Sequence, residues 1–154
     1  MFEPFRLRRE DLRRAYGLIQ LAHPEVSLDE WRRFARSHVE IARRDSGIMA
    51  LRDRRGTIHA LFTYRVARPM LGQASALQVT ELAAMRLPGT VLVEAVLRFA
   101  GEIARELELP SIALDMQPSA TFGQDRGAFE KHGFAVARVL LRGRAEDESG
   151  PAAR

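Results

Sequence analysis

The spacing of hydrophobic and polar residues changes several times along the first part of the chain. Residues 5–8 alternate apolar and basic side chains, which predicts a short strand. From Asp11 a helical period takes over and continues to Pro24, which predicts the end of that helix. The apolar face of this first helix consists of Leu12, Ala15, Tyr16, Ile19 and Ala22.

A second helix is predicted directly after the first. Ser27-Leu28-Asp29-Glu30 is a capping box, in which the Ser hydroxyl and the Glu carboxylate accept hydrogen bonds from each other's backbone N–H groups. The apolar side of this helix carries Trp31, Phe34, Ala35 and His38. Gly47 interrupts the pattern, and a short apolar strand follows at 48–51.

The middle of the chain predicts strands. Residues 53–56 form a turn in which Gly56 supplies a positive φ, and the β-rich run 57–67 completes a hairpin. A third central strand is expected at 76–85. A strong helix is expected at 91–107, and its apolar face carries Leu92, Val96, Phe99, Ile103 and Leu107.

The last third predicts a strand at 111–116, a short helix at 125–132 ended by Gly133, and a strand at 134–141. The complete order is β-α-α-β-β-β-α-β-α-β. Hairpin strands beside a strand–helix–strand crossover indicate an α/β (α+β) fold with a mixed, mainly antiparallel central sheet flanked by helices. We expect one domain over 1–144 and a disordered polar tail at 145–154.

Composition narrows the class of protein. The 154 residues include no cysteine, which excludes a disulfide scaffold and a thiolate nucleophile. The four histidines show no i, i+4 pair and no carboxylate pattern beside them, so we expect no metal site. No run approaches the ~18 apolar residues of a membrane span, and the first residues lack the apolar core of a signal peptide. We therefore expect a cytoplasmic protein that does not enter membranes.

The basic residues are almost all arginine. The net charge is +4, from 24 basic and 20 acidic residues, and Lys131 is the only lysine. Because arginine keeps its proton far above neutrality, this usage raises the pI to about 10.5 while the net charge stays modest. Residues 1–55 hold 13 arginines against 9 acidic residues. This excess could attract phosphates, but interleaved acidic residues favour solvated helix faces and disfavour nucleic-acid binding.

The order of elements, closed by Ala128-Phe129-Glu130-Lys131-His132-Gly133-Phe134, resembles the Gcn5-related N-acetyltransferase (GNAT) superfamily. The resemblance covers residues 5–142. Further matching pieces are Arg8-Arg9-Glu10-Asp11-Leu12, Gly56-Thr57-Ile58 and Thr80-Glu81-Leu82-Ala83. No piece is diagnostic alone, and the ordered set carries the resemblance to a divergent member.

The resemblance implies transfer of an acetyl or other acyl group from acyl-CoA to the amine of a small molecule or peptide. Glu81 matches the acid that serves as general base on the fourth strand. Backbone N–H groups of Ala83, Ala84 and Met85 would polarise the thioester carbonyl. The cofactor pyrophosphate would lie against Arg86, Gly89 and Thr90 at a helix N-terminus.

Three departures from the family pattern limit what the resemblance implies. Arg86-Leu87-Pro88-Gly89-Thr90-Val91 keeps only the Arg and first Gly of the phosphate loop, and Pro88 lacks an N–H donor. Phe129 stands where the family has a tyrosine acid, so Tyr64, Tyr16 or water would have to protonate the thiolate. No strand is predicted after 134–141, which leaves a sheet edge for a homodimer.

Two other classes of function stay open at this point. A GNAT-fold protein with a degenerate cofactor loop could be a binding or regulatory module without catalysis. A basic nucleic-acid-binding domain could use the arginines of the first third, although no aromatic residues interleave with them. The leading hypothesis is the N-acetyltransferase, with the acceptor and the acyl chain unidentified.

Overall fold

The computed structural model describes residues 1–39, 43–68, 71, 74–85, 87, 89, 91–115, 127 and 129–134, with only the backbone of Glu81. These residues contain a five-stranded sheet whose spatial order equals the chain order. Its strands are β1 (Glu3–Arg6), β2 (Ser46–Arg52), β3 (Ile58–Ala67), β4 (Ala76–Ala84) and β5 (Ser111–Asp115). β1 to β4 pair antiparallel and β5 joins β4 parallel, which confirms the predicted mixed, mainly antiparallel sheet.

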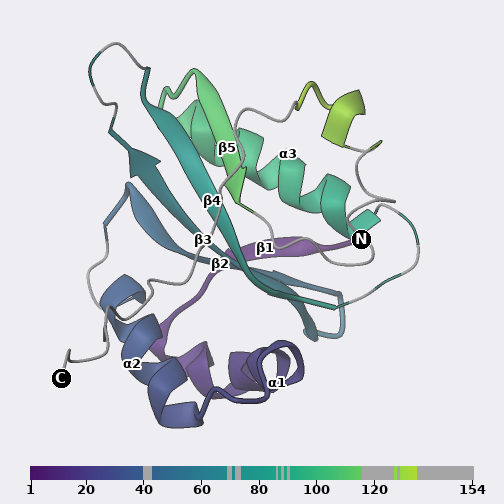
Figure 1. The fold of residues 1–154 in the computed structure, drawn as a ribbon. Helices are drawn as coiled ribbons and strands as arrows, with labels where there is room; N and C mark the ends of the chain where they lie inside the picture. The colour runs from purple at the N-terminus through teal and green to yellow at the C-terminus, as the bar shows by residue number, and fades with distance from the viewer. Residues whose placement is uncertain are drawn as a thin grey trace, which may run out of the picture.

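Helices cover both faces of the sheet. The 3-10 helix η1 (Arg9–Asp11), α1 (Leu12–Ala22) and α2 (Leu28–Val39) lie on one face, and α3 (Val91–Glu106) lies on the other (Figure 1). After β4 the chain passes over one face of the sheet as α3 and turns at Pro110. It then enters β5, which pairs parallel to β4. The predicted order of elements is confirmed from β1 to β5.

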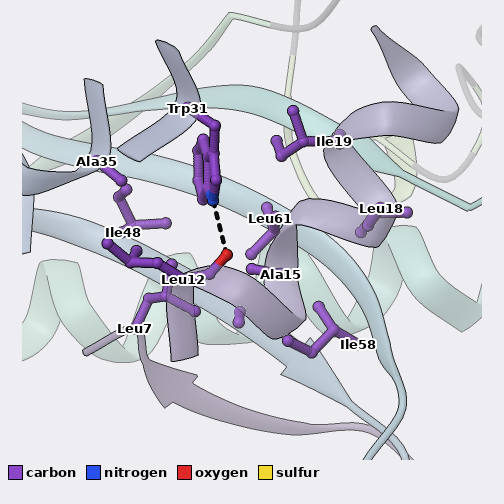
Figure 2. Close-up of a cluster of buried hydrophobic side chains, with 12 residues drawn as sticks. Leu7, Leu12, Ala15, Leu18, Ile19, Trp31, Ala35, Ile48, Ile58 and Leu61 are labelled. Atoms are coloured by element: carbon purple, nitrogen blue, oxygen red, sulfur yellow. Dashed lines mark hydrogen bonds between the residues drawn. The ribbon is translucent and has the colours of Figure 1, made fainter. Parts of the chain in front are cut away.

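Each face of the sheet has its own hydrophobic core. Under α1 and α2, Trp31, Ile48 and Leu61 are almost fully buried (Figure 2). Under α3, Leu77, Phe62 and Phe99 form the second core. Alternation of side chains along β3 places Leu61 in the first core and Phe62 in the second, so one strand contributes to both.

Side-chain hydrogen bonds fix the two helices on the first face. The predicted capping box is confirmed, since the Ser27 N–H donates to the Glu30 carboxylate at 2.8 Å and the Glu30 N–H donates to Ser27 Oγ at 3.3 Å. The buried Trp31 indole Nε1–H donates to the Leu12 carbonyl oxygen at 2.8 Å. This bond ties α2 to the first residue of α1 (Figure 2).

Some details differ from the sequence prediction. In α1 the structure buries Leu18 and exposes Ala22, the last residue of the helix. In α2, Phe34 is 43% exposed and stacks on Trp31, whereas Trp31 and Ala35, four residues apart, are the buried residues of the helix. Gly47 lies inside β2, where a Cβ would come within 3.0 Å of the Arg6 side chain.

Two predicted glycine roles are confirmed. Gly56 has φ +82° in the β2–β3 turn, and its N–H donates to the Asp53 carbonyl at 2.9 Å. Gly133 has φ +78°, and the Phe134 N–H reaches back to the Phe129 carbonyl at 3.0 Å, a Schellman helix end. The predicted strand 134–141 and the tail 145–154 lie outside the described residues, apart from Phe134.

Candidate active site at the bulge of β4

A bulge interrupts β4 near its C-terminal end. Leu61 of β3 pairs with Ala83, but the next residue, Phe62, pairs with Glu81, so Leu82 has no partner on β3. A bulge of this kind turns two consecutive side chains to one face and bends the strand. Leu82 and Ala83 accordingly both pack on the first core.

His23, at the C-terminal cap of α1, holds the bulge. Its Nε2 lies 2.7 Å from the Leu82 carbonyl oxygen, and because a carbonyl only accepts, the imidazole donates. Its Nδ1 lies 3.7 Å from the Glu25 carboxylate. Sequence reasoning considered this residue only as a metal ligand and missed its contact with β4.

The backbone after the bulge presents its N–H groups to two sides. The Met85 N–H donates to the His59 carbonyl of β3 at 2.8 Å. N–H groups of an antiparallel strand point alternately to its two neighbours, so the Ala84 N–H points to the opposite side of β4, where β5 lies. Of the three predicted donors, Ala84 is the one directed away from β3.

The β5 side of this segment begins where the parallel pairing ends. β4 and β5 pair from Ala76–Ser111 to Thr80–Asp115. β4 continues through Ala84, and within the described residues no strand flanks its last four positions on that side. Within the described residues, the end of β4 without a strand partner on this side and the bulge thus meet at the C-terminal end of two parallel strands, where α/β folds commonly bind ligands.

The turn from β4 to α3 follows within a few residues. Gly89 has φ +79°, and a Cβ built on it would meet no atom within 4 Å, so its backbone face is open. α3 begins at Val91, and the partial positive charge of a helix N-terminus favours anions. The predicted residues Arg86 and Thr90, and Pro88 between them, lie outside the described residues.

The candidate acid and base residues are placed differently from one another. Glu81 occupies the β4 position opposite Phe62, next to the bulge, and its side chain lies outside the described part of the structure. The Tyr16 hydroxyl donates to the Val26 carbonyl at 3.0 Å and closes the α1–α2 loop. Tyr64 is buried on β3, and burial raises the pKa of its hydroxyl although Arg6 lies nearby and opposes this. Phe129 is buried.

His59 and Asp53 form a second polar pair, on the β3 side of the site. His59 is the extra residue of a bulge in β3, because Leu51 pairs with Ala60 and Arg52 with Ile58. Its Nε2 lies 3.0 Å from Asp53 Oδ2, and its Nδ1 is buried without a partner in the described structure. This hydrogen bond lowers the pKa of Asp53.

The described residues offer neither a metal site nor a membrane-spanning helix. They contain no group of three or more His, Asp and Glu side chains that could hold a metal ion. None of their helices combines the length and the hydropathy needed to cross a membrane.

Comparison with known proteins gives a clear result for structure and none for sequence. No protein-family model matches the chain, and no curated protein matches it. Among solved structures, glucosamine-6-phosphate N-acetyltransferase from Arabidopsis thaliana has a TM-score of 0.67 and 21% identity, covering 95% of this chain and 99% of that one.

Two further neighbours agree with the first. An aminoglycoside N-acetyltransferase, AAC(6')-Iy, in complex with CoA has a TM-score of 0.73 and 9% identity, covering 94% of this chain and 95% of that one. Ribosomal-protein-alanine N-acetyltransferase from Brucella melitensis biovar Abortus 2308 has a TM-score of 0.68 and 14% identity, covering 94% and 100%. The resemblance noted in the sequence is confirmed at the level of architecture, and this chain has the fold of the Gcn5-related N-acetyltransferases.

Proposed function

We propose that this protein is an N-acetyltransferase that moves an acetyl or other acyl group from acyl-CoA to the amine of a small molecule or peptide. The observation that carries the proposal is the β4 bulge, which directs the Ala84 N–H to the β5 side, within seven residues of the start of α3 at Val91. Because a fold alone does not define an activity, it is this local geometry of β4 that supports the proposed acyl transfer.

The proposed reaction is direct attack in a ternary complex. The amine nitrogen attacks the thioester carbon, Glu81 removes the amine proton, and the C–S bond breaks to release CoA, whose thiolate then takes up a proton. The Ala84 N–H donates a hydrogen bond that stabilises the oxyanion. Ala83, next to the bulge, holds Ala84 in position. The Met85 N–H already donates to the His59 carbonyl oxygen, so we assign Met85 no hydrogen bond to the oxyanion; it only continues the strand beside Ala84.

Cofactor binding would use the open turn before α3. Gly89, Arg86 and Thr90, with the first N–H groups of α3, would hold the pyrophosphate. The open backbone face of Gly89 supports this role, because a phosphate could approach it without a clash. We place the activity in the cytoplasm, where acyl-CoA is available. A homodimer through the strand predicted at 134–141 is part of the same hypothesis, and light scattering of the purified chain would test it.

The first test separates binding from chemistry. Isothermal titration calorimetry should detect acetyl-CoA binding at low salt, and thiol release should follow when a panel of amines is added. Glu81→Gln should lower the rate of thiol release about 10²- to 10⁴-fold and leave acetyl-CoA affinity unchanged, because only proton transfer is removed. Glu108→Gln, on the exposed turn after α3, is the matched control and should keep the rate.

The same measurements address the second candidate function. The occupied Met85 N–H and the aromatic core residue Phe129 favour a binding module that has the fold without the chemistry. Binding of acetyl-CoA without thiol release for any amine would support that module. Absence of binding even at millimolar acetyl-CoA would contradict both the enzyme and a CoA-binding module.

A further inference from the structure

An open hollow lies between the start of α1 and the outer side of α2. Its volume is about 390 Å³, within the range of small-molecule sites. It is lined by Arg9, Glu10, Leu12, Arg13, Arg32 and Arg36. Four of these six residues are arginine, so the wall of the hollow is strongly basic.

Helical spacing explains part of this gathering. Arg32 and Arg36 are four residues apart on α2, and residues separated by four in an α-helix lie on the same face. Arg9 belongs to the 3-10 helix η1 and Arg13 to the first turn of α1, and both line the same hollow.

A buried hydrogen bond fixes the two helical segments that carry these arginines relative to each other. Trp31, next to Arg32, donates its indole N–H to the carbonyl of Leu12, next to Arg13. Trp31 and Leu12 are 2% and 3% exposed, and both belong to the first core (Figure 2). The helices under the arginines are thus held by the core, as a preformed site requires.

The lining of the hollow carries more positive than negative charge. It holds four arginines and one carboxylate, Glu10, which lies 4.0 Å from Arg8 outside the hollow. Arg32 has an exposed ion pair with Asp29 at 3.8 Å. In the described part of the chain, Arg9 and Arg13 have no carboxylate within ion-pair distance. Because guanidinium groups stay charged at any physiological pH, a bound anion would relieve their repulsion.

We propose that this hollow binds a small molecule carrying two or more phosphate groups. Arginine forks bind phosphate oxygens in pairs, and four arginines from two helical segments suit a ligand with two tetrahedral anionic groups. The confinement of the charges to a hollow favours a small ligand over a long nucleic acid. The site is also separate from the bulge of β4, because His23 contacts the bulge from the other end of α1, about 16 Å away along 11 helical residues.

The test is calorimetric titration of the purified chain with sodium pyrophosphate at low salt, without CoA, and the variants below locate the binding site. We expect binding, and the double variant Arg9→Gln/Arg13→Gln should weaken it at least tenfold. The control Arg54→Gln/Arg55→Gln removes the same charge from the exposed β2–β3 turn and should change the affinity less than twofold. Far-UV circular dichroism should show that both double variants are folded, and Arg32→Gln should weaken binding independently.

Several outcomes would overturn the proposal. These are no pyrophosphate binding by the wild-type chain, or equal weakening of binding by both double variants. A duplex DNA titration forms the last arm: tighter binding of DNA than of pyrophosphate would assign the arginines to nucleic acid instead. Failure of the acetyltransferase proposal is recognised separately, as absence of acetyl-CoA binding, and leaves the pyrophosphate arms intact.

Discussion

Asp53 carries most of the hydrogen bonds of the β2–β3 turn. Its Oδ1 accepts from the backbone N–H groups of Arg55 and Thr57, both at 2.9 Å, and its Oδ2 accepts from His59 at 3.0 Å. These bonds favour the ionised carboxylate, and the one from His59 is the largest cause of its lowered pKa. A single side chain thus couples the turn to the bulge of β3.

The Asp53 carboxylate should therefore make stability depend on acid pH. Because the folded-state pKa lies below the ordinary value of 3.8, the contribution is complete above that value and is lost as pH falls through the folded pKa. Asp53→Asn should be less stable than wild type near neutrality, and the difference should shrink below about pH 4. Urea unfolding from pH 6 to 2.5 measures this, and a constant difference across that range would contradict the prediction.

Gly56 is required by backbone conformation. Its φ is +82°, and a Cβ would lie 2.6 Å from the Arg14 side chain, which also donates a hydrogen bond to the Gly56 carbonyl. Gly56→Ala should cost about 1 to 2 kcal/mol. Gly17→Ala is the matched control: Gly17 lies inside α1 with nothing within 4 Å of its Cβ position, and the substitution should stabilise by roughly 0.5–1 kcal/mol. Chemical denaturation of the two variants should give shifts of opposite sign.

At the scale of elements, the bond between His23 and Leu82 joins α1 to the bulge of β4. Removing the imidazole would leave a partly buried carbonyl without its donor, at a cost of roughly 1–3 kcal/mol. His23→Ala should also speed hydrogen exchange at Leu82 and Ala83. His38→Ala is the control, because the His38 ring bonds only within α2. Equal effects of the two substitutions on exchange in β4 would show that His23 does not hold the bulge.

The elements themselves could be predicted from local signals. The capping box at Ser27, the positive φ of Gly56 and the helix end at Gly133 each depend on residues close in sequence, and all three are confirmed. The bulge could not be predicted. An extra residue would show as a break in the alternation of apolar and polar residues, but the alanines of β4 make that alternation indistinct. The contact between His23 and Leu82 spans 59 residues, and neither segment contains a sequence pattern that indicates it.

At the scale of the whole molecule, one sheet separates two hydrophobic cores. The only tryptophan, Trp31, lies in the core under α1 and α2, while Leu77 is fully buried in the core under α3. β3 contributes to both cores, so we expect them to unfold together as one cooperative unit.

Leu77→Ala tests this coupling. The cavity should destabilise the protein by about 2–5 kcal/mol, and the unfolding midpoint from Trp31 fluorescence should fall as far as the midpoint from circular dichroism. Leu21→Ala, at a residue 75% exposed, should change stability by less than about 0.5 kcal/mol. An unchanged fluorescence midpoint in Leu77→Ala would mean that the two layers unfold separately.

The strand order also sets the sequence of events during folding. Neighbouring strands β2, β3 and β4 are joined by residues 53–57 and 68–75, so the entropy lost in closing these short loops is small. We expect this three-stranded unit to form early, from local contacts. The bulge gains its partner His23 only when α1 docks from 59 residues away. The geometry proposed for catalysis is therefore among the last features of the protein to be established, after the sheet that supports it.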